Sequence, residues 1–168
     1  MLLFMGKYVR IVDAVNYRMG RVMMYFIFVM VAILLWSSIS KTFFLPSLWT
    51  LELAQFAMVA YYILGGPYSM QQGAHVRMDL FYGGWSDRKK AQIDAITVLF
   101  LIFYLGVMLY GAYDSTSYSF QYGERSPTAW RPYLWPIKVV MCFGIFMMLL
   151  QSISELFKDI ATLKGVEL

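Results

Sequence analysis

Four apolar stretches, each close to twenty residues long, fill most of this 168-residue chain. They lie at about 21–40, 49–66 (or 49–72), 95–113 and 134–151. The hydrocarbon core of a bilayer is about 30 Å thick, and about 20 apolar residues of helix cross it. The connections are short, so little chain is left for a soluble domain. We therefore predict one membrane domain, residues 1–168, that crosses the bilayer four times.

The composition supports helices rather than strands in that membrane. Charged residues make up 14% of the chain, whereas about a quarter is usual in soluble domains. A span must bond its own backbone polar groups, as a helix does. The apolar runs also lack the alternating pattern of barrel strands. We predict an all-α integral membrane fold with four transmembrane helices.

Basic residues divide unequally between the two sides that four spans define. Ten share the side of both termini: Lys7, Arg10, Arg18, Arg21, Arg77, Arg88, Lys89, Lys90, Lys158 and Lys164. The opposite side has four: Lys41, Arg125, Arg131 and Lys138. Because lysine and arginine accumulate in cytoplasmic segments, we predict that both termini are cytoplasmic. This placement accounts for the net charge of +4 without a nucleic-acid partner.

The segment before the first span has its own helical pattern. Apolar side chains recur at helical spacing: Phe4, Tyr8, Ile11, Val15 and Met19. Charged residues occupy the other faces, where they can meet anionic lipid headgroups. The pattern predicts a short amphipathic helix in the cytoplasmic interface, although the same face could contact a partner protein.

Two charged residues fall near the outer ends of predicted spans. Glu52 begins the second span and Lys138 begins the fourth, at matching depth. Ionisable groups inside membranes usually pair with one another or serve function. We predict a structural role, in which Glu52 and Lys138 pair with each other or with residues of a partner subunit.

Glycines mark points where membrane helices can approach closely. We expect such contacts at Gly106 and Gly111 on the third span and at Gly65 and Gly66 on the second. The contacts could form within the bundle or against a partner.

No pattern of catalytic or metal-binding residues emerges from the sequence. His75 is the only histidine, so the chain cannot supply two histidine ligands to a haem. We find no nucleophile beside a base, no glycine-rich phosphate loop and no carboxylate cluster. The sequence therefore predicts no enzyme activity, cofactor, metal site or substrate site. Two alternatives stay open: a membrane anchor of an electron-transfer complex, and a stand-alone small oligomeric channel.

The connection between the second and third spans carries the most informative motif. It reads Gly-Ala-His-Val-Arg-Met-Asp-Leu-Phe-Tyr over residues 73–82, followed by Asp-Arg-Lys-Lys over 87–90. Together with Arg18, a first span that ends in tryptophan, Glu52 and the segment 126–138, it resembles the small membrane subunits of tripartite ATP-independent periplasmic (TRAP) transporters. The resemblance covers nearly the whole chain.

This resemblance implies a non-catalytic scaffold subunit in the bacterial inner membrane. In that family a large multi-span subunit performs sodium-coupled symport, and a periplasmic binding protein delivers an organic acid. The small subunit pairs with the large one, among membrane phospholipids. Within this picture we predict that the inner connection contacts the partner or lipid phosphates through His75, Arg77, Asp79, Arg88, Lys89 and Lys90. A local Arg77–Asp79 pair that fixes the turn is the alternative.

Overall fold

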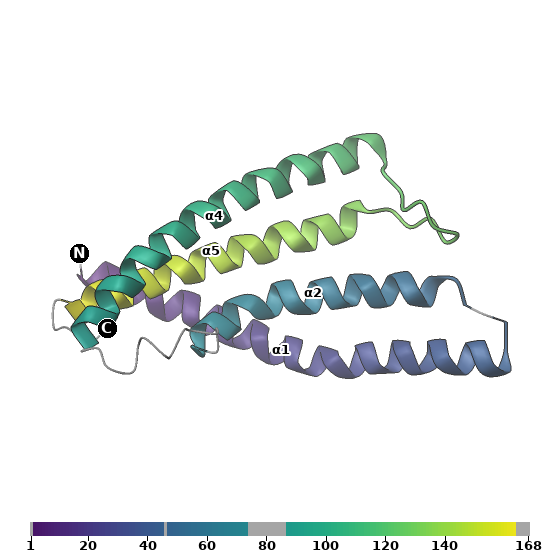
Figure 1. The fold of residues 1–168 in the computed structure, drawn as a ribbon, viewed down its shortest axis with the longest axis horizontal. Helices are drawn as coiled ribbons and strands as arrows, with labels where there is room; N and C mark the ends of the chain where they lie inside the picture. Colours follow the sequence, from purple (N-terminus) through teal and green to yellow (C-terminus); the bar gives the residue numbers. More distant parts are fainter. Residues whose placement is uncertain (1, 46, 74–86, 164–168) are drawn as a thin grey trace.

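The computed structural model describes residues 2–45, 47–73 and 87–163. Most of these residues form four long helices. They are α1 (Leu2–Phe43), α2 (Trp49–Gln71), α4 (Asp87–Tyr122) and α5 (Trp135–Leu163). All four run along the long axis of an elongated molecule, in which α1 pairs with α2 and α4 with α5 (Figure 1). In these described ranges the prediction of an all-α fold is confirmed.

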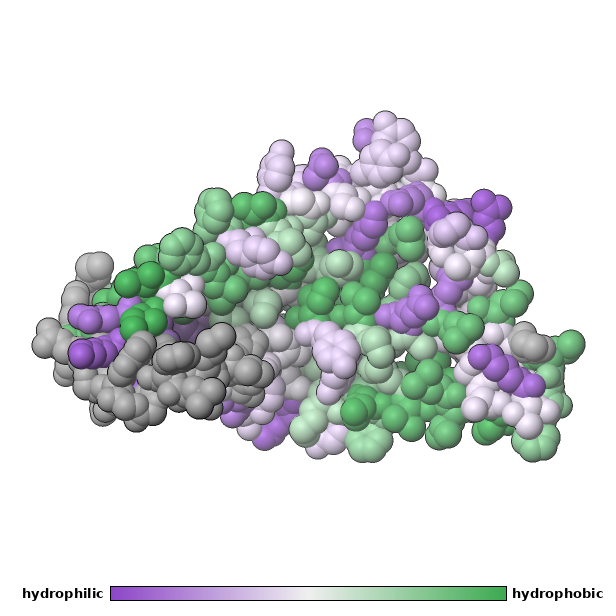
Figure 2. Space-filling view, viewed as in Figure 1, coloured by the Kyte–Doolittle hydropathy of each residue, from purple (hydrophilic) through white to green (hydrophobic). Residues whose placement is uncertain are grey.

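Three of the helices are long and apolar enough to cross a membrane. These candidate spans cover Met5–Phe43, Gln92–Tyr122 and Trp135–Leu163. Helix α2 is 23 residues long and continues through Pro67 to Gln71. Glu52 and Gln55 lower its hydropathy, so α2 is not among the three candidates. On the face seen in Figure 2, apolar side chains cover most of the middle, and hydrophilic ones lie mainly nearer the two ends.

The N-terminal segment does not form the separate interfacial helix that we predicted. It is the first part of α1, an unbroken helix of 42 residues, about 63 Å long at 1.5 Å per residue. Met5, Val9 and Val12 of this segment are buried within the bundle, whereas Ile11 and Val15 of the predicted apolar face lie on its surface, available to lipid or to a partner protein. The segment also packs against α5. For example, the Tyr8 hydroxyl donates to the Leu150 carbonyl over 3.2 Å.

Helix α5 is the centre of the bundle because α1, α2 and α4 all pack against it. Two glycines permit the closest approaches. A Cβ atom on Gly144 of α5 would overlap the Ile63 side chain of α2, and one on Gly20 of α1 would overlap Tyr68 of α2. Of the predicted contact points, Gly66 lies against the Met148 side chain. No atom lies within 4 Å of the Cβ positions of Gly65, Gly106 and Gly111.

Candidate functional site

A buried polar network joins α1 and α5 toward the end of the bundle where α1 begins and α5 ends, which we call the inner end (Figure 1). The Asn16 amide of α1 donates to Gln151 Oε1 of α5 over 2.6 Å. The Gln151 amide donates in turn to Asp13 Oδ1 over 3.1 Å, and the Ser154 hydroxyl donates to the same oxygen over 3.0 Å. Lys158 forms an ion pair with Asp13 Oδ2 at 2.8 Å. Asn16, Gln151 and Ser154 are almost completely buried, so this inner network is part of the core.

Two further contacts extend the inner network. Gln71 of α2 donates to the Asp13 backbone carbonyl over 3.2 Å, which adds a third helix. Glu155 accepts from Gln151 and from Lys158, each at 2.9 Å. The carboxylates of Asp13 and Glu155 accept hydrogen bonds only, so they fix the Gln151 amide with its nitrogen toward them. That orientation leaves Gln151 Oε1 to accept from Asn16. The network therefore has a defined donor direction and braces three helices.

A second polar cluster closes the outer connection between α4 and α5. Lys138 Nζ lies 2.7 Å from Glu124 Oε2 and donates to Ser119 Oγ over 2.6 Å. Ser119 also donates to Glu124. The direct pair between Glu52 and Lys138, one of our two alternatives, is therefore not formed. Glu124 lies only 14 residues from Lys138 across the connection, so the local carboxylate takes the ammonium group.

The outer connection itself is folded into a hairpin. Ser126 N donates to the Pro132 carbonyl over 2.9 Å, and Leu134 N donates to the Glu124 carbonyl over 3.0 Å. The Arg125 guanidinium stacks over the Tyr133 ring at 4.1 Å. Gly123 and Arg131 take positive φ angles of 61° and 52°, which arginine adopts rarely. These contacts hold the segment between Tyr122 and Trp135 in one conformation.

The outer cluster predicts a pH dependence that is confined to this hairpin. Hydrogen bonds from Lys138 and Ser119 hold the pKa of the Glu124 carboxyl below its usual 4.5. A lowered pKa in the folded state means that the cluster is intact above 4.5 and is lost as the pH falls through the lowered value. We expect NMR shifts of the Ser126 and Leu134 amides to titrate with a midpoint below 4.5.

The Lys138→Met variant provides the check on that assignment. Without the ammonium group, the midpoint at the Ser126 and Leu134 amides should rise toward 4.5. An unchanged midpoint in Lys138→Met would show that another group causes the titration. Thr162→Val, an exposed change on α5 far from the hairpin, should leave the midpoint as it is.

Glu52 is buried in the outer part of α2 without the partner that we expected for it. It is 7% exposed, and its Oε2 atom is fully covered yet accepts no hydrogen bond. Thr50, two residues earlier, is completely buried and bonds to Ser37 of α1 over 3.1 Å. The outer ends of α1 and α2 are thus joined by hydroxyl groups, with the carboxylate of Glu52 beside them.

Half of the six predicted contact residues of the inner connection lie outside the described residues. This holds for His75, Arg77 and Asp79. Arg88, Lys89 and Lys90 fall in the first turn of α4, where Lys89 is exposed and Lys90 half-buried. Their contacts with a partner or with lipid stay a prediction.

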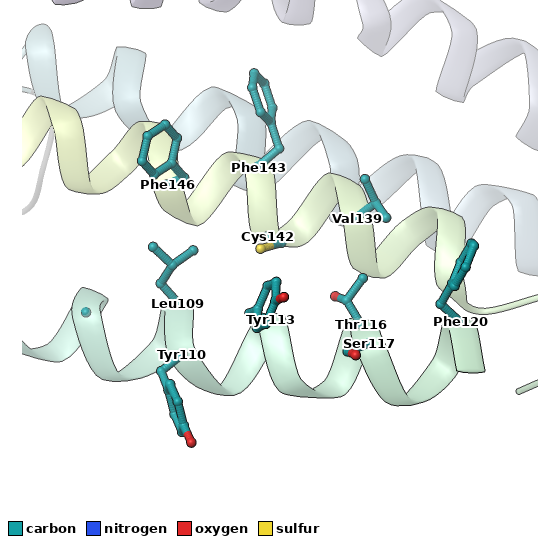
Figure 3. Close-up of a pocket in the computed structure, with 11 residues that line it drawn as sticks. Leu109, Tyr110, Tyr113, Thr116, Ser117, Phe120, Val139, Cys142, Phe143 and Phe146 are labelled. Carbon is teal, nitrogen blue, oxygen red and sulfur yellow. The ribbon is translucent and has the colours of Figure 1, made fainter. Parts of the chain in front are cut away.

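An apolar groove of about 830 Å³ follows the seam between α4 and α5. In Figure 3, Leu109, Tyr113 and Cys142 lie between the two helices, whereas Tyr110 and Phe143 point away. Its lining residues carry no charge; its polar groups are the hydroxyls of Tyr110, Tyr113, Thr116 and Ser117 and the thiol of Cys142. Such a surface offers an ion no counter-charge. Among the described residues, no group of three or more His, Cys, Asp or Glu side chains could hold a metal ion either.

Residues 30–162 match the family model described as tripartite ATP-independent periplasmic transporters, DctQ component. No curated protein and no solved structure matches the chain. The matched range includes the end of α1, all of α2, α4 and nearly all of α5.

Proposed function

The chain belongs to the DctQ component family of tripartite ATP-independent periplasmic transporters, and we propose that it is the fixed scaffold on which the large transport subunit moves. The DctQ family is a family of transporter components rather than of enzymes, and its members work with a large membrane subunit and a periplasmic binding protein. The chain would lie in the bacterial inner membrane with four spans and both termini in the cytoplasm. The complete system would import an organic acid together with sodium.

The scaffold role rests on one observation: charged groups in the two polar clusters are paired with partners inside this chain. Lys158 of α5 forms ion pairs with Asp13 of α1 and with Glu155 of its own helix. Asp13 also accepts a hydrogen bond from Gln151 of α5. Glu124 and Lys138 close the outer hairpin in the same way. A transport cycle needs ionisable groups that can exchange partners as the protein changes shape. These groups instead hold neighbouring elements in one arrangement, as a scaffold requires.

The outer surface of the bundle supports a role as a subunit. In the apolar stretches of α1 and α4, only 6% of the residues are buried within the bundle. The corresponding share for α5 is 28%. Apolar helix surfaces of this extent must be covered by lipid or by another membrane protein. A large membrane subunit would cover part of them.

Two measurements test this function together. The tagged chain, expressed with its large subunit, should co-purify with a multi-span protein that mass spectrometry identifies. Vesicles that contain the chain alone should show no sodium-dependent uptake of organic acids, whereas vesicles with all components should. Sodium-dependent uptake by the chain alone would overturn the scaffold role. A haem absorption band in the purified chain would instead support an electron-transfer anchor.

A further inference from the structure

We propose that Glu52 is the docking point for a basic side chain on a membrane helix of the large transport subunit. The proposal rests on the proposed function and adds where the two subunits recognise each other. Glu52 is only 7% exposed. Its Oε2 atom is fully covered and accepts no hydrogen bond. A buried charge without a partner is unfavourable, and native structures rarely keep one without a reason.

The hydroxyl groups nearest to Glu52 in sequence are used elsewhere. Thr50 Oγ1 lies 3.1 Å from Ser37 Oγ and 3.0 Å from Ser47 Oγ. Ser40 donates to the Leu45 carbonyl over 2.9 Å. The Thr50–Ser37 bond joins α1 to the start of α2, the other two bonds are local, and none of them includes the carboxylate.

None of the four basic residues on the outer side of the described chain is bonded to Glu52. Lys138 is held by Glu124 and Ser119, and Arg125 stacks on Tyr133 and donates to its hydroxyl. Lys41 lies exposed in the last turn of α1 and Arg131 exposed in the hairpin. Throughout the described part of the chain, no ion pair or hydrogen bond involves the Glu52 carboxylate. A basic group from another molecule would complete the pair.

The start of a helix explains why a carboxylate is tolerated there before the subunits meet. Glu52 lies in the first turn of α2, where the positive end of the helix dipole stabilises a negative charge. A guanidinium or ammonium group would provide both the charge and the missing hydrogen bond. Charge pairs of this kind fix the register of an interface more than they raise its affinity.

Conservative variants separate an ion pair from a simple hydrogen bond. Glu52→Gln keeps the size and the acceptor oxygen but removes the charge, and Glu52→Asp keeps the charge on a shorter side chain. Gln55→Leu, an exposed polar residue one turn later, is the matched control. Each tagged variant is expressed with the large subunit, and the recovered ratio of the two subunits is measured after detergent extraction.

We expect Glu52→Gln to lower recovery of the large subunit at least about tenfold, since truncation of a buried charge pair also strands the partner's charge. Glu52→Asp should retain part of the recovery, and Gln55→Leu should equal the wild type. Size-exclusion chromatography of each variant alone must show the wild-type profile. Wild-type recovery with Glu52→Gln would overturn the pairing. Failure of the wild type itself to recover a large subunit would instead overturn the proposed function.

A suppressor experiment identifies the partner residue. Glu52→Arg should abolish uptake in cells, because it places two basic groups together. Restored uptake should then map to a basic residue on a membrane helix of the large subunit that has become acidic or neutral. Suppressors confined to the small subunit would contradict an intersubunit pair.

Discussion

Replacement of Gly144 by alanine is expected to destabilise the protein by about 3 kcal/mol, the upper end of the range for an overpacked core. The added Cβ would overlap the Ile63 side chain and lie 3.2 Å from the Ile63 carbonyl carbon and oxygen. Backbone atoms cannot rotate away, so α2 and α5 must separate. Thermal unfolding in detergent measures the effect, at about 2–4 °C for each kcal/mol in a chain of this size.

The control for Gly144 uses glycines in open positions of the same bundle. Gly106→Ala and Gly65→Ala add a Cβ with no atom within 4 Å. Because alanine favours a helix over glycine by about 1 kcal/mol, both variants should be as stable as the wild type or slightly more so. Equal losses at Gly144 and Gly106 would mean that the packing between α2 and α5 does not depend on Gly144.

Replacement of Gln151 by leucine should have an effect of similar size through a different cause. Gln151 is fully buried and bonds to Asn16, Asp13 and Glu155. Leucine fills the space but leaves the Asn16 amide without an acceptor and removes a donor from two carboxylates. Each buried polar group that loses its partner costs about 1–3 kcal/mol, so we expect about 2–4 kcal/mol in total by the same thermal assay.

Thr162→Val is the control for that substitution. It lies on α5 as well, but Thr162 is exposed and bonds only to a carbonyl of its own helix. Its effect should stay within about 0.5 kcal/mol. A Gln151→Leu variant that melts like the wild type would show that the inner network does not brace the helices.

Hydropathy predicted the helices but not where they end. All four apolar stretches are helical, yet α1 begins at Leu2 and α4 continues to Tyr122, well beyond residues 21 and 113. A span ends where the bilayer ends, whereas a helix ends where its backbone bonding ends. Nothing breaks α1 before Phe43, and α4 continues until Gly123, whose φ of 61° suits a residue that follows a helix.

The inner network could not be predicted from apolar patterns. Asn16 and Gln151 are 135 residues apart, and a pattern of apolar residues gives no reason to pair two amides. The face of α1 that is buried within the bundle is formed by Asn16 together with Met5, Val9 and Val12, and it differs from the apolar stripe that hydrophobicity alone selects. An uncharged amide between apolar turns, on the first helix and again on the last, was the available signal. The two amides can be paired only once it is known that α1 and α5 are in contact.

The contacts of Asp13 and Asn16 also constrain how the chain is made. Gln151, Ser154 and Lys158, which bond to them, are synthesised 135 or more residues later. Until then α1 carries an amide and a carboxylate whose partners in α5 do not yet exist. Only when α5 packs against α1 do Asn16 and Asp13 gain these bonds. A chain that stops short of α5 leaves the Asn16 amide and the Asp13 carboxylate without these partners.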